Sequence, residues 1–284
     1  MLRKTKLGEA DLILTMLAEN GTQLRCVAKG ARKPKGRFSG RFELLGEVDV
    51  VVYEGKSLGT ITDVTVVSSN AGCRRDLELL SYASVVAQFA EKSTFEGQEN
   101  PILYRLTQAV ITALGESDVA FAPFIVAAYL IKAAAYMGLR PSFDDCVSCG
   151  APRVNGVQPD DSGVDGARLE SAQPDRGGAF SIAAGGWVCS DCADYSGTRG
   201  TRGGHGGSDF DTFGIASDDV LEPAVAEWVR ALMGLRFSEI PTQEALVVPG
   251  SSYLAGALLG FCEKWLQAHL GLRLKTMSYL SVLH

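Results

Sequence analysis

The spacing of apolar residues changes once along this chain, near residue 75, and that change limits the folds open to it. Before it, apolar residues form short alternating or continuous runs, the pattern of half-buried strands. These runs cover residues 12–17, 23–28, 48–52 and 58–67. After it, apolar residues recur at helical spacing. A strand block followed by a helix block predicts two segregated domains and not an alternating α/β fold.

The strand block, residues 1–75, is predicted to form a small all-β barrel. Its four or five short strands have the size and rhythm of the OB-fold. Residues 76–284 are predicted to form an all-α domain. Its expected helices cover residues 77–90, 102–114, 121–137, 220–233 and 253–270. Asp218 or Asp219 can cap the fourth helix, because short acidic side chains accept hydrogen bonds from a first helical turn.

Residues 119–139 are nearly all apolar and long enough to cross a bilayer. Pro123 lies near the start of this stretch and Lys132 near its middle, where a charge inside a membrane is costly. We therefore predict a buried central helix and no membrane contact. At the N-terminus, Glu9 and Asp11 interrupt the sequence before an apolar signal segment can form. The chain is expected to be cytoplasmic.

The net charge of −6 is unevenly distributed. Residues 1–80 hold 13 Lys/Arg against 10 Asp/Glu, whereas the remainder holds 14 against 23. An acidic protein can still bind nucleic acid through a basic region, because the local electrostatic field at the binding face, and not the net charge, determines the interaction. The N-terminal domain is therefore the better candidate for a polyanionic partner.

One segment of that domain, which we call the basic arm (residues 25–41), carries seven cations and no acidic residue. They are Arg25, Lys29, Arg32, Lys33, Lys35, Arg37 and Arg41. Glycines and a proline interrupt the run, which predicts a loop between strands that follows a phosphate backbone. Phe38 and Phe42 alternate with the cations and either stack on bases or complete the barrel core; we favour the core.

Four of the seven cysteines form two CxxC pairs, Cys146 with Cys149 and Cys189 with Cys192. In a chain expected to be cytoplasmic this pattern indicates metal binding and not disulfides. Four thiolates make a closed tetrahedral Zn²⁺ site with no open position for catalysis. The sequence therefore predicts a structural zinc element at about 141–195.

The two pairs are separated by 39 residues, more than the usual zinc-ribbon spacing. A loop at 151–178 is expected to contain the additional residues. A second loop is expected at 196–209, where glycine dominates. Gly150 and Gly186 supply the loose backbone that tight turns need. The other cysteines fall in apolar patterns and are predicted to be core residues: Cys26, Cys73 and Cys262.

No enzyme signature is present in the sequence. It contains no GxxxxGK[ST], no GxGxxG after a strand and no HExxH. The acidic pairs Asp144-Asp145 and Asp160-Asp161 fall in expected surface loops, and no acidic cluster for metal-dependent nuclease chemistry stands out. The chain is predicted to have no catalytic residues.

Several segments closely resemble the bacterial RecO recombination-repair proteins. They are KLGEAD (6–11), VAKGARKPKGRFSGRFELL (27–45), VVVYEGKSLGTITDV (50–64), GLRPSFDDCVSCG (138–150), GGWVCSDC (185–192) and YLAGALLGFCEKWLQAHLGLRLKTMSYL (253–280). The resemblance fails over 151–178 and 196–214. The N-terminus is a few residues shorter than in the family, so the first barrel strand is expected to be incomplete.

The resemblance implies an OB-fold, a helical domain with a zinc element, and a mediator role in DNA repair and homologous recombination. RecO-like proteins bind single- and double-stranded DNA and anneal complementary strands. With RecR they help to load RecA onto DNA coated by single-stranded DNA-binding protein. Two alternatives remain open: a zinc-stabilised protein-interaction or regulatory module without a direct DNA role, and a zinc-dependent nucleic-acid enzyme.

Overall fold

The computed structural model describes residues 1–55, 58–153, 178–194, 213–214, 220–246 and 251–280. The two expected long loops lie almost wholly outside these residues. The chain divides into two compact units, one of Met1–Gly138 with Ala231–His284 and one of Leu139–Arg230. The first unit holds the strand block together with most of the helices. A domain boundary at residue 75 stays a prediction.

The N-terminal region is β-rich, and all four expected strands are present. The strands are β1 (Arg3–Leu7), β2 (Asp11–Leu17), β3 (Gln23–Ala28), β4 (Glu47–Tyr53) and β5 (Gly59–Ser68). They form one sheet of order β1-β2-β3-β5-β4, in which only the β3–β5 pair is parallel. β1 has no apolar alternation and is exposed at every position, so the sequence pattern did not identify it.

The described strands do not close into a barrel. β1 and β4 are the two ends of the sheet. At the seam between them, the amino group of Met1 donates to the carbonyl of Gly46 at 2.9 Å, and the N–H of Leu45 donates to the carbonyl of Met1 at 2.9 Å. These bonds lie just before each strand and do not extend into a ladder. The β-rich region is therefore observed, while a closed OB barrel is not confirmed.

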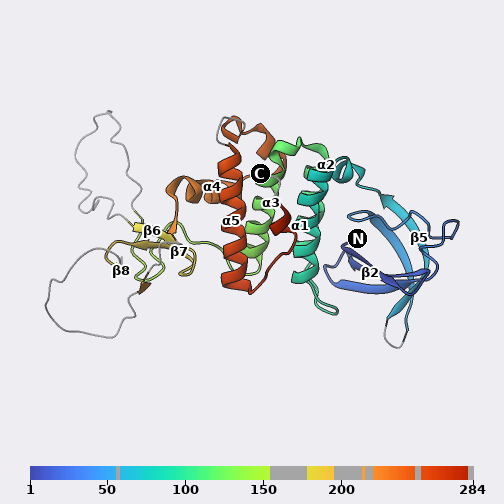
Figure 1. Cartoon of the computed structure of the whole chain (residues 1–284). Coiled ribbons are helices and arrows are strands. Elements are labelled where there is room, and N and C mark those ends of the chain that lie inside the picture. The colour runs from blue at the N-terminus through green and yellow to red at the C-terminus, as the bar shows by residue number, and fades with distance from the viewer. Residues whose placement is uncertain (56–57, 154–177, 195–212, 215–219, 247–250, 281–284) are drawn as a thin grey trace, which may run out of the picture. The chain divides into compact units, whose positions relative to one another are not determined.

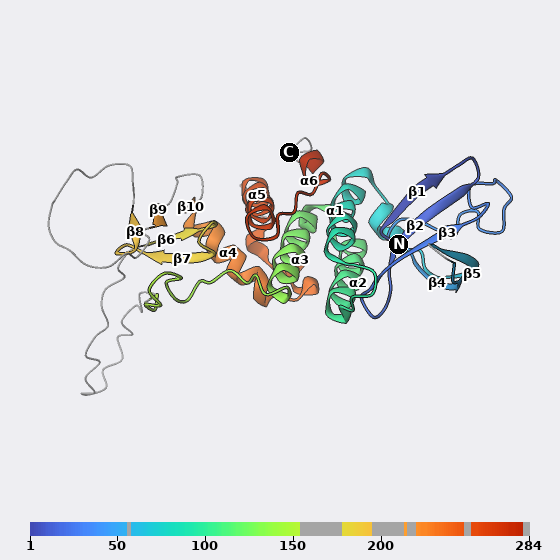
Figure 2. The same cartoon turned by 90° about the horizontal axis from the view of Figure 1, so that it is seen from below.

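The concave face of the sheet holds the core of this region. Alternate residues of the strands point inward and are buried, since successive side chains of a strand face opposite sides. The buried set comprises Leu14, Met16, Cys26, Ala28, Phe38, Phe42, Ile61 and Val64. Only glycine fits at residue 59, because a Cβ there would lie 2.5 Å from Val52 Cγ1. Figure 2 shows the strands side by side.

Helices make up most of the rest of the first unit. They are α1 (Leu77–Ser93), α2 (Pro101–Glu116), α3 (Ala122–Tyr136), α5 (Ser251–Leu270) and α6 (Met277–Leu280), with short 3₁₀ turns η1 (Ala71–Arg74), η2 (Val119–Phe121), η4 (Phe237–Thr242) and η5 (Glu244–Leu246). Asp76 caps α1 by accepting from the N–H of Leu79 at 2.7 Å, and Asn100 caps α2 by accepting from that of Leu103 at 3.0 Å.

α3 is the central helix, packed between α1 and α5 (Figure 1). By length and hydropathy, Val119–Tyr136 is apolar enough to span a membrane, yet 67% of this window is buried inside the protein. Lys132 donates to the carbonyl of Met233 at 2.7 Å, and burial lowers the pKa of its ammonium group. These contacts confirm the prediction of a buried central helix.

The second unit is small and built around a hairpin. Its strands are β6 (Gly178–Ser181), β7 (Gly186–Cys189), β8 (Ala193–Asp194), β9 (Phe213–Gly214) and β10 (Val220–Leu221). β6 pairs with β7 and with β10. The helix expected from residue 220 begins later, as α4 (Pro223–Gly234), because Val220 and Leu221 pair with β6. Asp218 and Asp219, the expected caps, lie outside the described residues.

Candidate metal centre and nucleic-acid interface

The two CxxC pairs converge on one point in the second unit. The sulfur atoms of Cys146, Cys149, Cys189 and Cys192 all lie within 4.8 Å of one another. Cys149 Sγ and Cys189 Sγ are 3.7 Å apart, too far for a disulfide bond. Four thiolates at the usual Zn–S distance in a tetrahedron are about 3.8 Å apart. The sulfur positions therefore fit one tetrahedral metal ion.

The first pair, Cys146 and Cys149, lies in a tight turn whose two ends are hydrogen-bonded to each other. The N–H of Gly150 donates to the carbonyl of Cys146 at 2.8 Å, and Gly150 has a left-handed φ of 71°. The N–H of Cys146 donates to the carbonyl of Ala151 at 2.8 Å. The glycine expected to supply the backbone freedom does so, since other residues rarely adopt this conformation.

The hairpin of β6 and β7 carries the second pair to the first. The N–H of Val147 donates to the carbonyl of Trp187 at 2.9 Å, which fixes the first turn on β7. Gly186 permits this approach, because a Cβ there would lie 2.5 Å from the carbonyl oxygen of Ser142. Trp187 and Val188 pack with Cys146 and Cys189 in one buried cluster. β7 thus leads directly into the second pair.

The backbone favours the thiolate form of one of the four cysteines, Cys146, while burial raises the pKa of the Cys189 thiol. Burial opposes ionisation of Cys146, but N–H groups of Cys189, Cys149 and Ser148 point to its sulfur and lower its thiol pKa to about 6. The N–H of Cys189 lies 3.4 Å from that sulfur. Thiolates are the form that binds metal. All four ligand positions are cysteines, so the cluster can hold a metal without an open coordination position.

The remaining cysteines are core residues, as expected. Cys26, Cys73 and Cys262 are each at most 1% exposed. Burial raises the pKa of all three thiols, that of Cys73 to about 11. Protonated, enclosed thiols of this kind behave as small apolar side chains. They are separate from the four-cysteine cluster.

Arg25 lies on β3 and not in the expected loop, whereas the other six cations of the basic arm lie in the loop between β3 and β4; all seven are exposed. Phe38 and Phe42 anchor it: they are 6% and 4% exposed, and their rings pack against each other with centroids 5.7 Å apart. Their assignment to the core is confirmed. The arm is thus fixed to the sheet by its aromatic residues while its charges stay in solvent.

Three arginines of the arm are tied to the sheet. Arg37 Nη2 lies 2.9 Å from Asp63 Oδ1 on β5, and Arg41 donates to the carbonyl of Val64 at 2.8 Å. Arg32 donates to the carbonyl of Gly8 at 3.0 Å. The pKa of Asp63 is lowered by the N–H of Val64 and then by Arg37. Asp63 neutralises one of the seven charges, which the sequence pattern did not indicate.

The other four cations are Arg25, Lys29, Lys33 and Lys35. Within the described part of the chain, no ion pair involves any of them. Long cationic side chains in this state keep their charge available to phosphate groups. The structure thus separates the predicted set into unpaired cations and anchored arginines.

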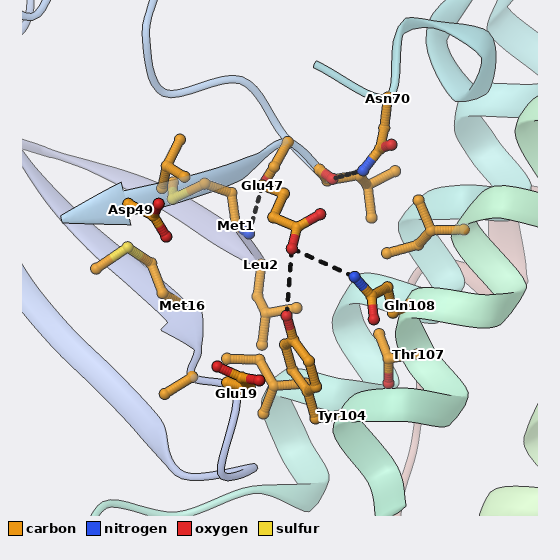
Figure 3. Close-up of a pocket in the computed structure, with 16 residues that line it drawn as sticks. Met1, Leu2, Met16, Glu19, Glu47, Asp49, Asn70, Tyr104, Thr107 and Gln108 are labelled. Atoms are coloured by element: carbon orange, nitrogen blue, oxygen red, sulfur yellow. Dashed lines mark hydrogen bonds between the residues drawn. The ribbon is translucent and has the colours of Figure 1, made fainter. Parts of the chain in front are cut away.

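A cavity of about 310 Å³ opens between β4, the end of β2 and α2 (Figure 3). Three carboxylates line it, from Glu19, Glu47 and Asp49. Glu47 accepts from the Tyr104 hydroxyl at 3.4 Å and from the Gln108 amide at 3.3 Å. Carboxylates repel phosphate, so the lining of this cavity disfavours a nucleic-acid backbone.

The acidic pair Asp144-Asp145 lies at the surface, as predicted. Asp144 Oδ1 lies 2.7 Å from Arg230 Nη2, with both side chains well exposed. Asp160 and Asp161 lie outside the described residues. Among those described, the four cysteines are the only group of metal-binding side chains found.

Taken together, a β-rich N-terminal region with an exposed basic arm and a helical region with a four-cysteine cluster define a two-part protein with features of nucleic-acid binding. Comparison with protein families gives two matches. Residues 1–70 match the model described as "Recombination protein O N terminal", and residues 74–200 match "Recombination protein O C terminal". The chain belongs to the RecO family.

The individual relatives found for this chain carry the same family name. The chain is 32% identical over 194 residues to a DNA repair protein RecO of Bifidobacterium adolescentis, covering 67% of this chain and 70% of the relative. It is 30% identical over 192 residues to that of Desulfitobacterium hafniense, covering 68% and 62%. The protein of Bifidobacterium longum is 35% identical over 153 residues, covering 53% and 63%. The match thus spans less than two thirds of the Desulfitobacterium and B. longum relatives.

Proposed function

We propose that this protein is a DNA repair and recombination mediator without enzymatic activity. It binds single- and double-stranded DNA through the basic arm and promotes the annealing of complementary strands. With RecR it helps to load RecA onto DNA coated by single-stranded DNA-binding protein. Family membership supports this role, and the observation that carries it is the arm itself: seven exposed cations on β3 and the loop after it, four of them without an ion pair among the described residues, with two buried phenylalanines that anchor the loop.

The physical case for DNA binding is electrostatic. Neutralising phosphates releases condensed counterions, and this is the largest sequence-independent contribution to DNA affinity. The arm is fixed to the sheet before DNA binds, so fewer backbone conformations are lost on binding. Annealing needs no nucleotide hydrolysis when cations screen the repulsion between two strands. The N-terminal sheet then acts as an OB-type module, in the cytoplasm.

We further propose that the four cysteines hold one structural Zn²⁺. The sulfur spacing and the N–H groups directed at Cys146 support this assignment. When bound, the ion supplies four cross-links between the turn at 146–149 and the end of the β6–β7 hairpin. Its function is then to hold the second unit together.

A single titration series tests the DNA role. We propose fluorescence anisotropy with a labelled oligo-dT probe and with a duplex, from low to high salt, for the wild type and for an arm variant. The arm variant carries Ala at Lys29, Arg32, Lys33, Lys35 and Arg37. If about five phosphates are contacted, log K against log salt should have a slope of roughly −3 to −4 for single strands. The arm variant should lose most of this slope.

The matched control removes five cations from elsewhere in the chain. It carries Ala at Arg230, Arg236, Lys264, Arg273 and Lys275, an equal change in net charge. This control should retain the wild-type slope. If it loses the slope while the arm variant keeps it, the DNA site lies on the helical part and the arm is accessory. Absence of salt-dependent binding by the wild type would favour the alternative role as a protein-interaction module.

A further inference from the structure

The four residues of the cysteine cluster differ in their access to solvent. Cys146 and Cys189 are each 2% exposed, whereas Cys149 is exposed and Cys192 is half-buried. The turn around Cys149 is open as well, since residues 147–150 are all exposed. The cluster therefore presents one of its cysteines to reagents in solution.

The two buried cysteines are enclosed by the hairpin. Trp187 and Val188 of β7 pack with Cys146 and Cys189 in one cluster, and both β7 residues are themselves buried. The N–H of Cys189 lies 3.4 Å from Cys146 Sγ, which holds these two buried residues together. A small solute therefore meets the cluster first at Cys149.

The exposed cysteine has a second sulfur atom within reach. Cys149 Sγ lies 3.7 Å from Cys189 Sγ, although the two residues are 40 positions apart in the sequence. A disulfide needs an S–S distance of about 2 Å, so a small movement of the exposed turn brings the two sulfur atoms to bonding distance. An oxidised Cys149 thus has a partner thiolate beside it.

From this arrangement we infer that Cys149 is an oxidation-sensitive ligand, and that a peroxide converts the metal site into a disulfide between Cys149 and Cys189. The inference rests on the proposed zinc site. Cysteines are most readily oxidised when they are thiolates, accessible to solvent and next to a second cysteine that resolves the product. In a reducing cytoplasm, disulfides of this kind are transient and serve as redox sensors.

The reaction takes place at two sulfur atoms, with hydrogen peroxide as the oxidant. The Cys149 thiolate attacks one peroxide oxygen and breaks the O–O bond, which gives the sulfenic acid of Cys149 and a hydroxide ion. The Cys189 thiolate then attacks the Cys149 sulfur, forms the S–S bond and displaces a second hydroxide ion. Two thiolates thus lose two electrons, the peroxide gains them, and the two hydroxide ions take up two protons from the solvent.

The disulfide removes half of the ligand set. Only Cys146 and Cys192 remain as thiolates, whereas a structural zinc site uses four ligands, so the oxidised cluster no longer retains the ion. The new S–S bond still joins the turn at 146–149 to the end of the β6–β7 hairpin. Reduction by a dithiol regenerates both thiolates. Oxidation should therefore release the metal reversibly.

The test follows metal release from the zinc-loaded full chain during a titration with hydrogen peroxide. A chromogenic chelator reports the zinc that is released, and the wild type should lose its whole equivalent. Peptide mapping after alkylation should find one disulfide, between Cys149 and Cys189. The enclosed thiols of Cys26, Cys73 and Cys262 should stay reduced, because they are at most 1% exposed. Addition of a dithiol and zinc should restore the metal content.

Cys149→His and Cys192→His form a matched pair of variants. Each leaves three cysteines and one histidine, a ligand set that structural zinc sites also use, so each should bind zinc before oxidation. Cys149→His lacks the sulfur at which oxidation starts and should retain zinc at peroxide concentrations that empty the wild type. Cys192→His keeps Cys149 beside Cys189 and should release zinc like the wild type. Metal analysis and thermal unfolding before the titration check that both variants are loaded and folded.

The outcomes distinguish this inference from the proposed zinc site. Retention of zinc by the loaded wild type, or a disulfide within either CxxC pair, would overturn the inference and leave the zinc site standing. Equal release from the wild type and both variants would also overturn it, because Cys149 would then not be the sensitive ligand. If a variant does not bind zinc, the disulfide map of the oxidised wild type decides alone. If the reduced wild type holds no metal at the start, the zinc site is wrong and the inference fails with it.

Discussion

The basic arm and the four-cysteine cluster are both irregular segments, but they are fixed in different ways. The arm carries its own anchors: Phe38 and Phe42 lie within or beside the run of cations and bury themselves in the adjacent core. The cluster also has buried neighbours, Trp187 and Val188, but it depends on contacts between two segments far apart in sequence. Its second pair reaches the first only because the β6–β7 hairpin brings Cys189 within 3.7 Å of Cys149 across 40 positions of sequence.

This difference indicates which substitutions should destabilise the arm and which should destabilise the cluster. The arm depends on apolar burial, which is distributed over many contacts of one core. The cluster depends on a few thiolates, whose metal binding is coupled to folding. Loss of one ligand should therefore be more damaging than loss of one anchor, and loss of one surface charge should matter least for stability.

The largest expected effect is loss of a metal ligand. Purified wild type should contain one equivalent of zinc, and Cys189→Ser should lose it together with the fold of the second unit, because ligand and fold are linked. Cys26→Ser, at a fully buried position outside the cluster, should keep the metal and cost about 1–3 kcal/mol for the buried hydroxyl. Metal analysis and thermal unfolding check both. Wild type with well under one equivalent, and no loss of stability on chelation, would refute the zinc assignment.

The next effect concerns the anchors of the arm. Phe38→Ala should lower the free energy of unfolding by about 3–5 kcal/mol, since it removes a buried ring from the sheet core. Urea denaturation measures this change. It should also weaken DNA binding without altering the metal content. A change below about 1 kcal/mol would show that the ring is not packed as the structure has it.

A smaller effect should separate unpaired from paired cations in the arm. Lys33→Ala should reduce the slope of log K against log salt by about 0.7 on single strands, because one phosphate contact is lost. Arg37→Ala should have less effect, since Asp63 already balances this charge. Asp63→Asn should raise affinity by freeing Arg37. Equal slopes for Lys33→Ala and Arg37→Ala would show that the ion pair does not persist when DNA binds.

The smallest effect is expected at the surface of the second unit. Arg230→Ala breaks the ion pair with Asp144, yet both side chains are substantially exposed. Exposed pairs contribute about 0–1 kcal/mol, so the free energy of unfolding should change by less than about 1 kcal/mol. Thermal unfolding of this variant beside Cys189→Ser gives the direct comparison. A loss as large as that of the cysteine variant would show that the thiolates do not dominate the stability of this unit.

The sequence by itself determined most element types and the identities of the candidate ligands. Period-2 and helical spacing of apolar residues are local signals, and they correctly located β2 to β5, α1 to α3 and α5. The CxxC pairs identified the four sulfur atoms, and the cations of the arm were visible as a run of basic residues without an acidic one. For Phe38 and Phe42 the sequence left base stacking and core as alternatives with the core favoured, and their burial confirms the core.

Only the tertiary structure decided which strands pair and which side chains come into contact. β1 has no apolar alternation and is a strand because β2 pairs with it, and Val220-Leu221 is a strand instead of a helix start because β6 offers it a partner. The Arg37–Asp63 ion pair and the parallel pairing of β3 with β5 join segments far apart in sequence. Such contacts are set by packing and chain closure across the whole core, which no local pattern of residues encodes.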